Sequence, residues 1–473
     1  MKVLLITPPY TKERLSKKDV KNVEARLPPL GMLYVAAVLE KNKQQVKVID
    51  GVTLSVAKGY TLKNVEEDIR KFNPEVIGLS IVSLLMDQGQ KILDIAKHVN
   101  PKCITIIGGP LISADPKKLK EIRNADYAFT GEAELTFSML VDALEHKKEV
   151  KDIPGLVYRN KDEIVANYPE PIDDLDTIPM PARHLINMNM YRPSPGNYRR
   201  LPATQIMTSR GCPYRCTFCS RPTVGKKFRA HSAKRVVDEI EFLVKKYGVK
   251  DIEIFDDTFT LEPRRVEDIC REIIKRKIDV TWNCLTRADR ITPELCILMK
   301  KAGCYELGFG IESGSQRVLN HIKKDITLDK VRKGIKIAKD AKLDVRGFFI
   351  IGHLTETREE VMETIRFANN CGLDIAQYMI STPYPGTELW EQAKQMYGDK
   401  FNEKEMFNLT FFSPERVPFV SDKLTQKEVF ALYKKAYRSF YLRPKYMVKH
   451  LMKIKSFTDV ERYWKAARGI LIG

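Results

Sequence analysis

The sequence predicts an α/β protein with two domains of alternating strands and helices, followed by a helical tail. Short apolar runs bounded by Gly and Pro recur along residues 1–145 and again along residues 201–395, with helical stretches between them. Such alternation is typical of parallel sheets covered by helices. Repeated prolines disfavour regular helix in residues 146–200, which are predicted to connect the domains. Residues 396–473 are basic and predicted to be mainly helical.

Residues 1–145 predict a doubly wound, Rossmann-like sheet. Residues 2–7 form an apolar run that ends at two prolines, which is typical of a buried parallel strand, and a helix is expected over residues 30–39. Ligands bind such sheets beyond the carboxyl ends of the strands, where Gly and Ser residues follow the apolar runs in this sequence. The other expected strands span residues 45–50, 76–80, 104–109 and 126–132.

Residues 201–395 predict a partial (β/α)₆ barrel. Helical stretches separate the expected strands, and polar residues follow several of them. Catalytic residues of such barrels gather at the carboxyl ends of the strands. The expected strands span residues 203–207, 251–255, 280–284, 306–310, 345–351 and 376–380.

The most specific motif is CxxxCxxC, formed by Cys212, Cys216 and Cys219, and the next cysteine is Cys270. A zinc site would usually show a second pair of ligands at finger-like spacing. The odd number of nine cysteines and the lack of a secretory signal disfavour a disulfide framework. Closed four-iron clusters use four thiolates, so three local cysteines predict a cluster with one iron left open to a ligand.

With the flanking residues 207–212 and 219–222, this motif resembles the radical S-adenosylmethionine (SAM) superfamily. The resemblance implies that the three cysteines hold a [4Fe–4S] cluster. Its fourth iron would chelate SAM, which is then cleaved to methionine and a 5′-deoxyadenosyl radical. Phe218, between the last two cysteines, would lie against the adenine, although it is equally suited to a place in the core beside the loop.

The resemblance also implies SAM-binding residues at the ends of the barrel strands. Asp256 and Asp257 follow the second strand, where the family binds the methionyl amino group; the alternative is an Asp-rich turn and helix cap. Arg287 would face the SAM carboxylate or else pair with Asp289. Residues 310–314 resemble the fourth-strand motif that contacts the ribose or the carboxylate, with Glu312 and Ser313 as the hydrogen-bonding groups.

Two further residues are candidates for action on the substrate. His353 lies in the slot after the fifth strand, within residues 352–357, where this sequence departs from the family's commonest Gly-x-Pro-x-Glu-Thr form. Tyr384 ends the sixth strand in a loop that resembles the adenine-side loop of this subgroup. A capping or core role for His353 and a wall of the pocket for Tyr384 are the alternatives.

Short motifs occur in a set order along the first domain: Pro-Pro after the first strand, Pro28-Pro29-Leu30-Gly31, Ile-Asp-Gly after the second strand, Gly108-Gly109-Pro110 and Gly131-Glu132. In this order they resemble the cobalamin-binding domain that precedes many radical SAM cores. Each glycine alone is weak evidence, because tight turns also need glycine, but the order of the motifs across the domain supports the resemblance. The residues expected to bind cobalamin are Pro8, Pro9, Gly31, Asp50, Gly51, Ser80, Gly108, Gly109, Gly131 and Glu132.

One departure from cobalamin domains concerns the lower ligand of cobalt. The Asp-x-His-x-x-Gly motif is absent, and the first histidine of the chain is His98. A bound cobalamin is therefore expected to be base-off, without a protein histidine from the first loop. The alternative is a domain that has kept the fold and lost the cofactor.

The formal net charge is +19, and residues 421–473 contribute thirteen Lys and Arg against four Asp and Glu. Aromatic and aliphatic residues alternate with lysines there at helical spacing. The pattern predicts either a surface for an anionic membrane or lipid-like substrate, or a solvated helix face that caps the barrel. No RNA-binding signature accompanies the charge, so nucleic acid is not expected.

Taken together, the motifs of both domains most resemble the subgroup that includes anaerobic magnesium-protoporphyrin ester cyclase and hopanoid-modifying enzymes. This resemblance predicts a cobalamin-dependent radical SAM methyltransferase acting on an unactivated carbon of a small-molecule or lipid-like substrate. A non-methylating cyclase or ring-rearranging enzyme is the first alternative, and an iron–sulfur redox or sensing module is another. An external donor such as ferredoxin or flavodoxin would supply the electron. The expected location is an oxygen-poor cytoplasm, with peripheral membrane contact through the tail.

Overall fold

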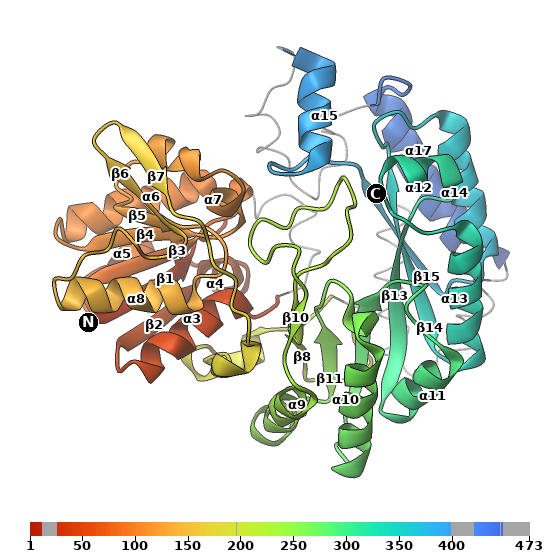
Figure 1. Ribbon diagram of the computed structural model, residues 1–473, viewed down its shortest axis with the longest axis horizontal. Coiled ribbons are helices and arrows are strands. Elements are labelled where there is room, and N and C mark those ends of the chain that lie inside the picture. Colours follow the sequence, from red (N-terminus) through yellow and green to blue (C-terminus); the bar gives the residue numbers. More distant parts are fainter. Residues whose placement is uncertain (12–25, 195, 399–420, 445, 448–473) are drawn as a thin grey trace. The chain divides into compact units, whose positions relative to one another are not determined.

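The computed structural model describes residues 1–11, 26–194, 196–398, 421–444 and 446–447 (Figure 1). The chain divides into two compact units. The first contains Met1–Pro193 and takes in Arg210–Pro213 and Ser220–His231. The second contains Ser194–Ser209 and Tyr214–Cys219, and continues from Ser232 onward. The chain therefore passes from one unit to the other within the cysteine motif.

The first unit is built on a seven-stranded sheet of order β2-β1-β3-β4-β5-β6-β7. The strands β1 to β5 pair in parallel, and all five strands expected from the sequence are confirmed. The central strands β1, β3 and β4 are mostly apolar and buried, because helices cover both faces of the sheet. The five are β1 (Lys2–Thr7), β2 (Gln45–Asp50), β3 (Val76–Ser80), β4 (Ile104–Gly108) and β5 (Tyr127–Phe129).

The helices of the first unit form two layers. The helix α3 (Leu30–Lys41) packs against α8 (Glu134–Glu145), and together they cover the face that carries Val3 and Leu5. Leu4 and Ile6 point to the opposite face, because side chains alternate along a strand, and they are fully buried too. The remaining helices are α4 (Gly51–Lys58), α5 (Leu62–Phe72), α6 (Met86–Val99) and α7 (Pro110–Ala114).

The strand order refines the expected Rossmann-like topology. The order 2-1-3-4-5 is that of flavodoxin-like sheets, whose ligand site lies where the chain switches direction between β1 and β3. Thr7 and Ser80 are the last residues of these two strands. The topology alone therefore places a ligand site beside the loops after Thr7 and Ser80.

The proline-rich connector contains a hairpin that the sequence analysis did not assign. The strands β6 (Leu156–Asn160) and β7 (Glu163–Ala166) pair antiparallel, and β6 also pairs antiparallel with β5. This hairpin extends the first sheet and ends it. The rest of the described connector has three short 3-10 turns and no α-helix, as the repeated prolines led us to expect.

The second unit is an open barrel of six parallel strands in the order β15-β14-β13-β12-β11-β8. Each strand pairs with the next along the chain, and β8 does not pair with β15, so the barrel is not closed. All six strands expected from the sequence are confirmed. They are β8 (Ala203–Ile206), β11 (Asp251–Ile254), β12 (Thr281–Thr286), β13 (Cys304–Glu312), β14 (Asp344–Ile351) and β15 (Ile375–Ile380).

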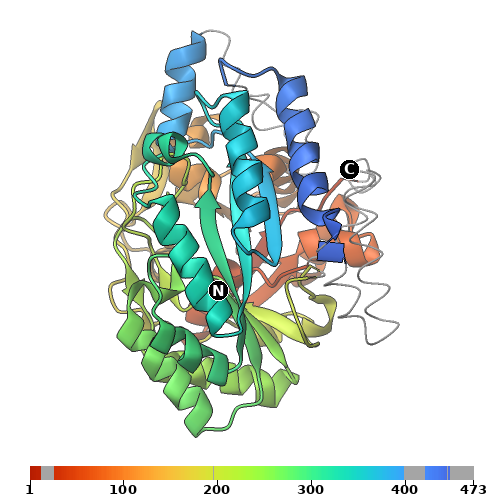
Figure 2. The ribbon, with the colours of Figure 1, turned by 90° about the vertical axis from the view of Figure 1, so that its right-hand side faces the viewer.

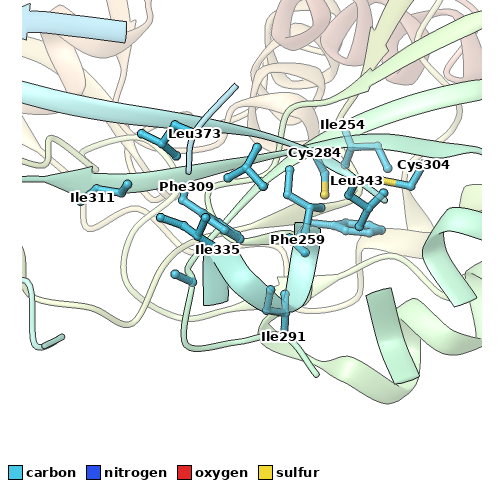
Figure 3. Close-up of a cluster of buried hydrophobic side chains, with 14 of the residues drawn as sticks. Ile254, Phe259, Cys284, Ile291, Cys304, Phe309, Ile311, Ile335, Leu343 and Leu373 are labelled. Atoms are coloured by element: carbon cyan, nitrogen blue, oxygen red, sulfur yellow. The ribbon is translucent and has the colours of Figure 1, made fainter. Parts of the chain in front are cut away.

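Helices cover the outer face of this sheet, as Figure 2 shows. Their apolar side chains and alternate residues of the strands form one large core, part of which appears in Figure 3. The sulfurs of Cys284 and Cys304 lie among these apolar side chains. The helices are α9 (Ala233–Tyr247), α10 (Pro263–Lys275), α11 (Pro293–Lys301), α12 (Gln316–His321), α13 (Leu328–Asp340), α14 (Arg358–Asn370) and α15 (Glu388–Tyr397).

The basic tail begins with the expected helix, α17 (Gln426–Tyr441). Val429, Leu432, Ala436 and Phe440 of this helix are buried in the barrel core. Its apolar face is therefore covered by protein, which favours the solvated-helix alternative over the membrane surface for this part of the tail. Residues 448–473, on which the rest of that prediction falls, lie outside the described residues. Among the described helices, none has both the length and the apolar character needed to cross a membrane.

Candidate functional site

The cysteine motif lies in an irregular loop between two short strands, β9 (Ser209–Arg210) and β10 (Arg229–Ala230), which pair as a two-stranded sheet. Gly211 opens the loop with φ of 82°, a conformation that favours glycine. A Cβ at this position would lie 2.1 Å from the carbonyl oxygen of Lys227, so no side chain fits there.

Hydrogen bonds fix the backbone of this loop on both sides of the motif. In the first unit, Arg221 donates from Nη1 to the carbonyl oxygen of Cys212 at 2.6 Å. In the second unit, the amide of Thr217 donates to Ile322, and the amide of Leu389 donates to Thr217. These bonds hold Thr217 to the end of α12 and to the first turn of α15.

The three thiols of the motif differ from the other cysteines in their surroundings. Cys212, Cys216 and Cys219 are partly exposed. Burial raises the pKa of Cys296 to about 12 and of Cys371 to about 12, so these thiols stay protonated at neutral pH. The thiolate is the form that binds metal, which leaves the motif as the accessible sulfur ligand set. Cys270, Cys284, Cys296 and Cys304 are buried, and Cys371 is half-buried.

The fit of this loop to an iron–sulfur cluster rests on its donor chemistry. Three thiolates at CxxxCxxC spacing suit iron in a sulfur environment. Among the described residues, no three His, Cys, Asp or Glu side chains lie close enough together to hold a metal ion. The cysteines would therefore gather around the cluster as it is assembled, a change that an irregular loop can make.

Asp256 lies at the end of β11, and its buried carboxylate is fully engaged within the protein. One oxygen accepts from the amides of Thr208 and Ser209, at 2.6 and 3.1 Å, and the other accepts from their hydroxyls. Arg265 lies 3.6 Å away as a counter-charge. These contacts do not support the expected bond to the methionyl ammonium. They show Asp256 holding the segment that leads from β8 into the cysteine loop.

Glu312 ends β13, and its carboxylate pairs with a residue that the sequence analysis missed. Lys324 donates from Nζ to Glu312 Oε1 at 2.7 Å, and both side chains are buried. Glu312 has φ of 70°, a strained value for a residue with a side chain. Such strain is common at ligand sites, and Glu312 keeps its place as a SAM-contact candidate with Lys324 added to it.

Arg287 pairs with Asp289, which is the second of the two roles predicted for it. Its Nε and Nη2 donate to Asp289 at 3.0 and 3.1 Å, and its other bonds go to the carbonyls of Lys324 and Asp325. The guanidinium lies 3.8 Å from the ring centre of Tyr214, within the cysteine motif. Arg287 therefore supports the loop that carries Cys216 and does not present a free guanidinium to the SAM carboxylate.

Three further candidates differ in how exposed their side chains are: Ser313, Asp257 and Tyr384. The hydroxyl of Ser313 is fully buried and bonds Thr364 and the amide of Ser315, which makes it a structural residue. Asp257 is exposed just after β11. Tyr384 is 40% exposed after β15, where its side chain remains available to a ligand.

His353 is the most unusual of the predicted site residues. It is 1% exposed, and neither ring nitrogen has a hydrogen-bond partner among the described residues. Burial and the neighbouring His321 lower its pKa to about 3, so the ring is neutral. Its ring centre lies 6.1 Å from that of Phe218, in the cysteine motif. The carboxyl of Glu356 also has one unpartnered oxygen, and burial raises its pKa to about 8.

Phe218 itself packs against the barrel core and lies beside Lys324, whose Nζ is 6.0 Å from the ring centre. The core role expected for Phe218 is therefore present. The unpaired groups of His353 and Glu356 lie on the loop next to it. Buried polar groups are nearly always paired, so these groups mark a place where a ligand or water completes the site.

In the first unit, the expected cobalamin residues fall into three groups. Pro8 and Pro9 follow β1 and are buried. Asp50 caps α4, accepts from the Thr7 hydroxyl at 2.8 Å and from the Tyr191 hydroxyl at 3.0 Å. A Cβ on Gly51 would lie 2.3 Å from the carbonyl oxygen of Thr7. These residues pack β1 against α4 and shape the loops at the predicted switch point.

The second group, Gly31, Ser80, Gly108 and Gly109, is at least partly exposed. Gly31 is exposed in the first turn of α3, and a Cβ there would meet nothing within 4 Å. Ser80 and Gly108 end β3 and β4, and Gly109 follows with φ of 102°. Because the carboxyl ends of parallel strands meet at one edge, these positions suit the approach of a large ligand.

Gly131 and Glu132 make close contacts within the first unit. Gly131 has φ of 73°, and a Cβ there would lie 2.7 Å from Pro169, so its glycine is needed for close packing. Glu132 is 6% exposed and accepts two hydrogen bonds from Arg229, at 2.7 and 2.8 Å, and one from the amide of Ile172. Its carboxylate is thus engaged by partners within the protein.

Sequence reasoning missed the partners of these acids. Lys324, Arg229, Arg210 and Arg265 stand in ordinary polar contexts, and their partners lie 9 to 97 residues away. Glu356 was missed as a site residue too, although it had a sequence signal: it occupies the Glu position of the motif after the fifth strand.

Comparison with known protein families agrees with both units. The Radical SAM superfamily matches residues 206–368, and the B12 binding domain family matches residues 17–141. Among solved structures, the cobalamin-dependent S-adenosylmethionine radical enzyme OxsB, with aqua-cobalamin and S-adenosylmethionine bound, aligns with a TM-score of 0.77 and 18% identity. The alignment covers 100% of this chain and 71% of that one, which shows a shared fold.

Three curated relatives match over most of the chain. An uncharacterized methyltransferase of Pyrococcus horikoshii is 36% identical, over 100% of this chain and 98% of its own. A cytidylyl-2-hydroxyethylphosphonate methyltransferase of Streptomyces wedmorensis is 30% identical, over 87% and 84%. An anaerobic magnesium-protoporphyrin IX monomethyl ester cyclase of Rubrivivax gelatinosus is 29% identical, over 94% and 78%. The chain belongs to the radical SAM superfamily, in the group whose radical SAM domain follows a B12-binding domain.

Proposed function

We propose that the protein is a cobalamin-dependent radical SAM methyltransferase that acts on an unactivated carbon. The observation that carries the proposal is the pairing of two domains in one chain: a flavodoxin-type sheet with open strand ends and an open barrel with three partly exposed thiols. The methyltransferases among the relatives, at 36% and 30% identity, support methyl transfer.

In this proposal Cys212, Cys216 and Cys219 hold a [4Fe–4S] cluster. The cluster supplies the electron that cleaves SAM, and cobalamin supplies or receives the methyl group. The protein's own residues bind and orient the SAM. Glu312, backed by Lys324, would accept hydroxyl hydrogens of the ribose, because a carboxylate is a strong acceptor and this one is held by a buried cation.

His353 would bind SAM or the substrate. Its two unpaired nitrogens offer one donor and one acceptor, since the lowered pKa keeps the ring neutral. Tyr384 would lie at the substrate side, because it is exposed at the end of the last barrel strand. Neither residue needs to change its protonation to do so.

We propose further that cobalamin binds base-off, without a histidine from the first loop. The first histidine, His98, lies in the last turn of α6. The test is the electron paramagnetic resonance (EPR) spectrum of the Co(II) form, which should show no nitrogen splitting from an axial imidazole. A spectrum with such splitting would contradict this part of the proposal.

The electron must come from outside the chain, and we propose an acidic one-electron carrier such as ferredoxin or flavodoxin. The net charge of +19 favours encounter with an acidic partner. The setting we propose is an oxygen-poor cytoplasm, since accessible thiolates and a cluster with an open iron are easily oxidised. The substrate, small-molecule or lipid-like, remains to be identified by its product.

The deciding experiment uses anaerobically reconstituted protein, reductant, cobalamin and SAM with a deuterated methyl group, supplied with an extract of the producing cells. The proposal expects a product that carries the deuterium. An unlabelled product with 5′-deoxyadenosine would favour the cyclase or ring-rearranging alternative, which the relative at 29% identity supports. The absence of any SAM cleavage would favour an iron–sulfur redox or sensing module.

A further inference from the structure

Four charged side chains are buried together in the first unit. Glu132 lies in the loop between β5 and α8, Glu134 is the first residue of α8, and Arg210 and Arg229 come from β9 and β10. Each is 5% or 6% exposed. Two acids face two bases, so the group is neutral as a whole.

Glu132 is shared by both arginines. Arg229 donates from Nη1 and Nη2 to the two oxygens of Glu132, at 2.7 and 2.8 Å. Arg210 lies 3.6 Å from Glu132 and donates from Nη2 to Glu134 at 2.7 Å. The guanidinium of Arg210 also lies 5.2 Å from the ring centre of Tyr34, on α3. Acids and an aromatic ring of the B12-binding domain therefore fix both arginines.

The two arginines stand at the two ends of the cysteine loop. Arg210 comes two residues before Cys212, and Arg229 comes ten residues after Cys219. Arg229 also donates to the carbonyls of Ile172 and Val224, each at 2.8 Å. The stem of the loop is thus held to Glu132 from both strands.

Stability alone does not explain this arrangement. Burying charges costs desolvation, and apolar residues of similar size often serve equally well where only stability is needed. A bidentate guanidinium–carboxylate pair also fixes the orientation of the two side chains, because its two parallel hydrogen bonds hold both groups in one plane. Residues that orient metal ligands are commonly held by such outer partners.

We propose that Glu132 is a positioning residue for the cluster loop. The B12-binding domain supplies, through Glu132, the group that sets the direction of both strands entering the cysteine motif. The geometry of the cluster then depends on a residue of the other domain, 80 positions before Cys212. The inference rests on the proposed role of the three cysteines as cluster ligands.

Three variants of the full chain test it. Glu132→Gln keeps the shape and removes the charge, which leaves Arg229 buried without a counter-charge. Glu132→Gln combined with Arg229→Gln removes both charges and leaves Arg210 paired with Glu134, so it should fold normally. Asp173→Asn is the control, because it breaks an exposed ion pair between Asp173 of the connector and Lys227 of the cysteine loop.

The measurements are the iron content after anaerobic reconstitution, the EPR spectrum of the reduced cluster with and without SAM, and the rate of 5′-deoxyadenosine formation. Thermal unfolding of the metal-free proteins reports folding, and cobalamin titration reports the first domain. We expect both Glu132 variants to show an altered EPR spectrum and a fall of about tenfold or more in SAM cleavage. The double variant should unfold at the wild-type temperature and bind cobalamin as the wild type does, and Asp173→Asn should match the wild type throughout.

An unchanged EPR spectrum in the folded double variant would overturn the inference, and so would a loss of cobalamin binding with an intact cluster. If neither Glu132 variant folds, the charges serve the stability of the domain, and the inference is also overturned. Failure of the wild type to form a cluster would instead contradict the proposed function, so the two failures are distinguishable.

Discussion

Tyr437 of α17 bonds both backbone groups of Tyr378 on β15, the last strand of the open barrel. Its hydroxyl accepts from the Tyr378 amide at 3.2 Å and donates to the Tyr378 carbonyl at 3.1 Å. One turn later, Tyr441 bonds the amide and carbonyl of Ala376 in the same way. The two hydroxyls take the place of a neighbouring strand. They explain how a barrel of six strands protects its open edge.

Replacing both tyrosines by phenylalanine should expose this edge. Four backbone groups of β15 lose their partners, and each unpaired group costs about 1–3 kcal/mol. We expect a lower midpoint of thermal unfolding and concentration-dependent association in light scattering. Tyr168→Phe is the control, because that ring is 85% exposed. A double variant that stays monomeric and as stable as the wild type would contradict the edge role.

Gly31 and Gly51 form a matched pair for the cobalamin site. Gly31→Ala should stabilise the metal-free protein by about 0.5–1 kcal/mol, because alanine favours helix and the site is open. Gly51→Ala should destabilise it, because the new Cβ meets Thr7 and Pro9. If cobalamin approaches α3 as we propose, Gly31→Ala weakens cobalamin binding despite the added stability. Urea unfolding and cobalamin titration check both, and unchanged cobalamin affinity would remove Gly31 from the site.

The pair of Lys324 and Glu312 gives a prediction about stability and SAM binding. Lys324→Gln leaves a carboxylate buried without its cation, which should cost about 3–5 kcal/mol in the free energy of unfolding. Glu312→Gln with Lys324→Gln should recover most of that loss and still bind SAM more weakly. Urea unfolding and SAM titration measure the two effects. Full SAM affinity in the double variant would show that the pair only supports the fold.

The buried carboxyl group of Glu356 should make the stability of the folded protein depend on pH. Burial raises its pKa from the usual range to about 8, so the folded protein holds this proton more tightly than the unfolded chain does. The stability it contributes is full below the unfolded pKa, about 4.3, and is lost as pH rises through about 8. Wild type should therefore lose stability relative to Glu356→Gln between about pH 4.3 and 8. Urea unfolding of metal-free protein at several pH values measures this difference, and a constant difference would contradict it.

The cysteines give the most direct test of the cluster. Alanine at Cys212, Cys216 or Cys219 should abolish iron binding and 5′-deoxyadenosine formation, because a second iron of the cluster would then lack a protein ligand. Cys371→Ala should keep both, since that thiol is protonated and lies outside the motif. Iron analysis and Mössbauer spectra of the four variants decide the point. Iron retained in any of the three motif variants would contradict the assignment.

The sequence was sufficient to predict the strands, because buried parallel strands leave apolar runs that end at Gly and Pro. All strands expected in both sheets are present. The hairpin of β6 and β7 was missed although Val157, Tyr158, Ile164 and Val165 are typical strand residues, because the surrounding prolines dominated the interpretation. Local composition outweighed a pattern of only nine residues.

Side-chain partners could not be predicted in the same way. The acids Asp256, Glu132 and Glu312 were identified as candidates for ligands, since acids at strand ends often bind cofactors. The structure gives each of them a buried basic partner, which lies 9, 97 and 12 positions away in the sequence, respectively. Such pairing is set by tertiary packing, which a single sequence does not display.

The uneven burial of the cysteines provides a chemical handle on the protein. In the metal-free state, an alkylating reagent at neutral pH should modify the loop thiols first and leave the core thiols unreacted until unfolding. Mass spectrometry of the alkylated peptides would then count occupied cluster ligands directly, and could follow damage by air one sulfur at a time.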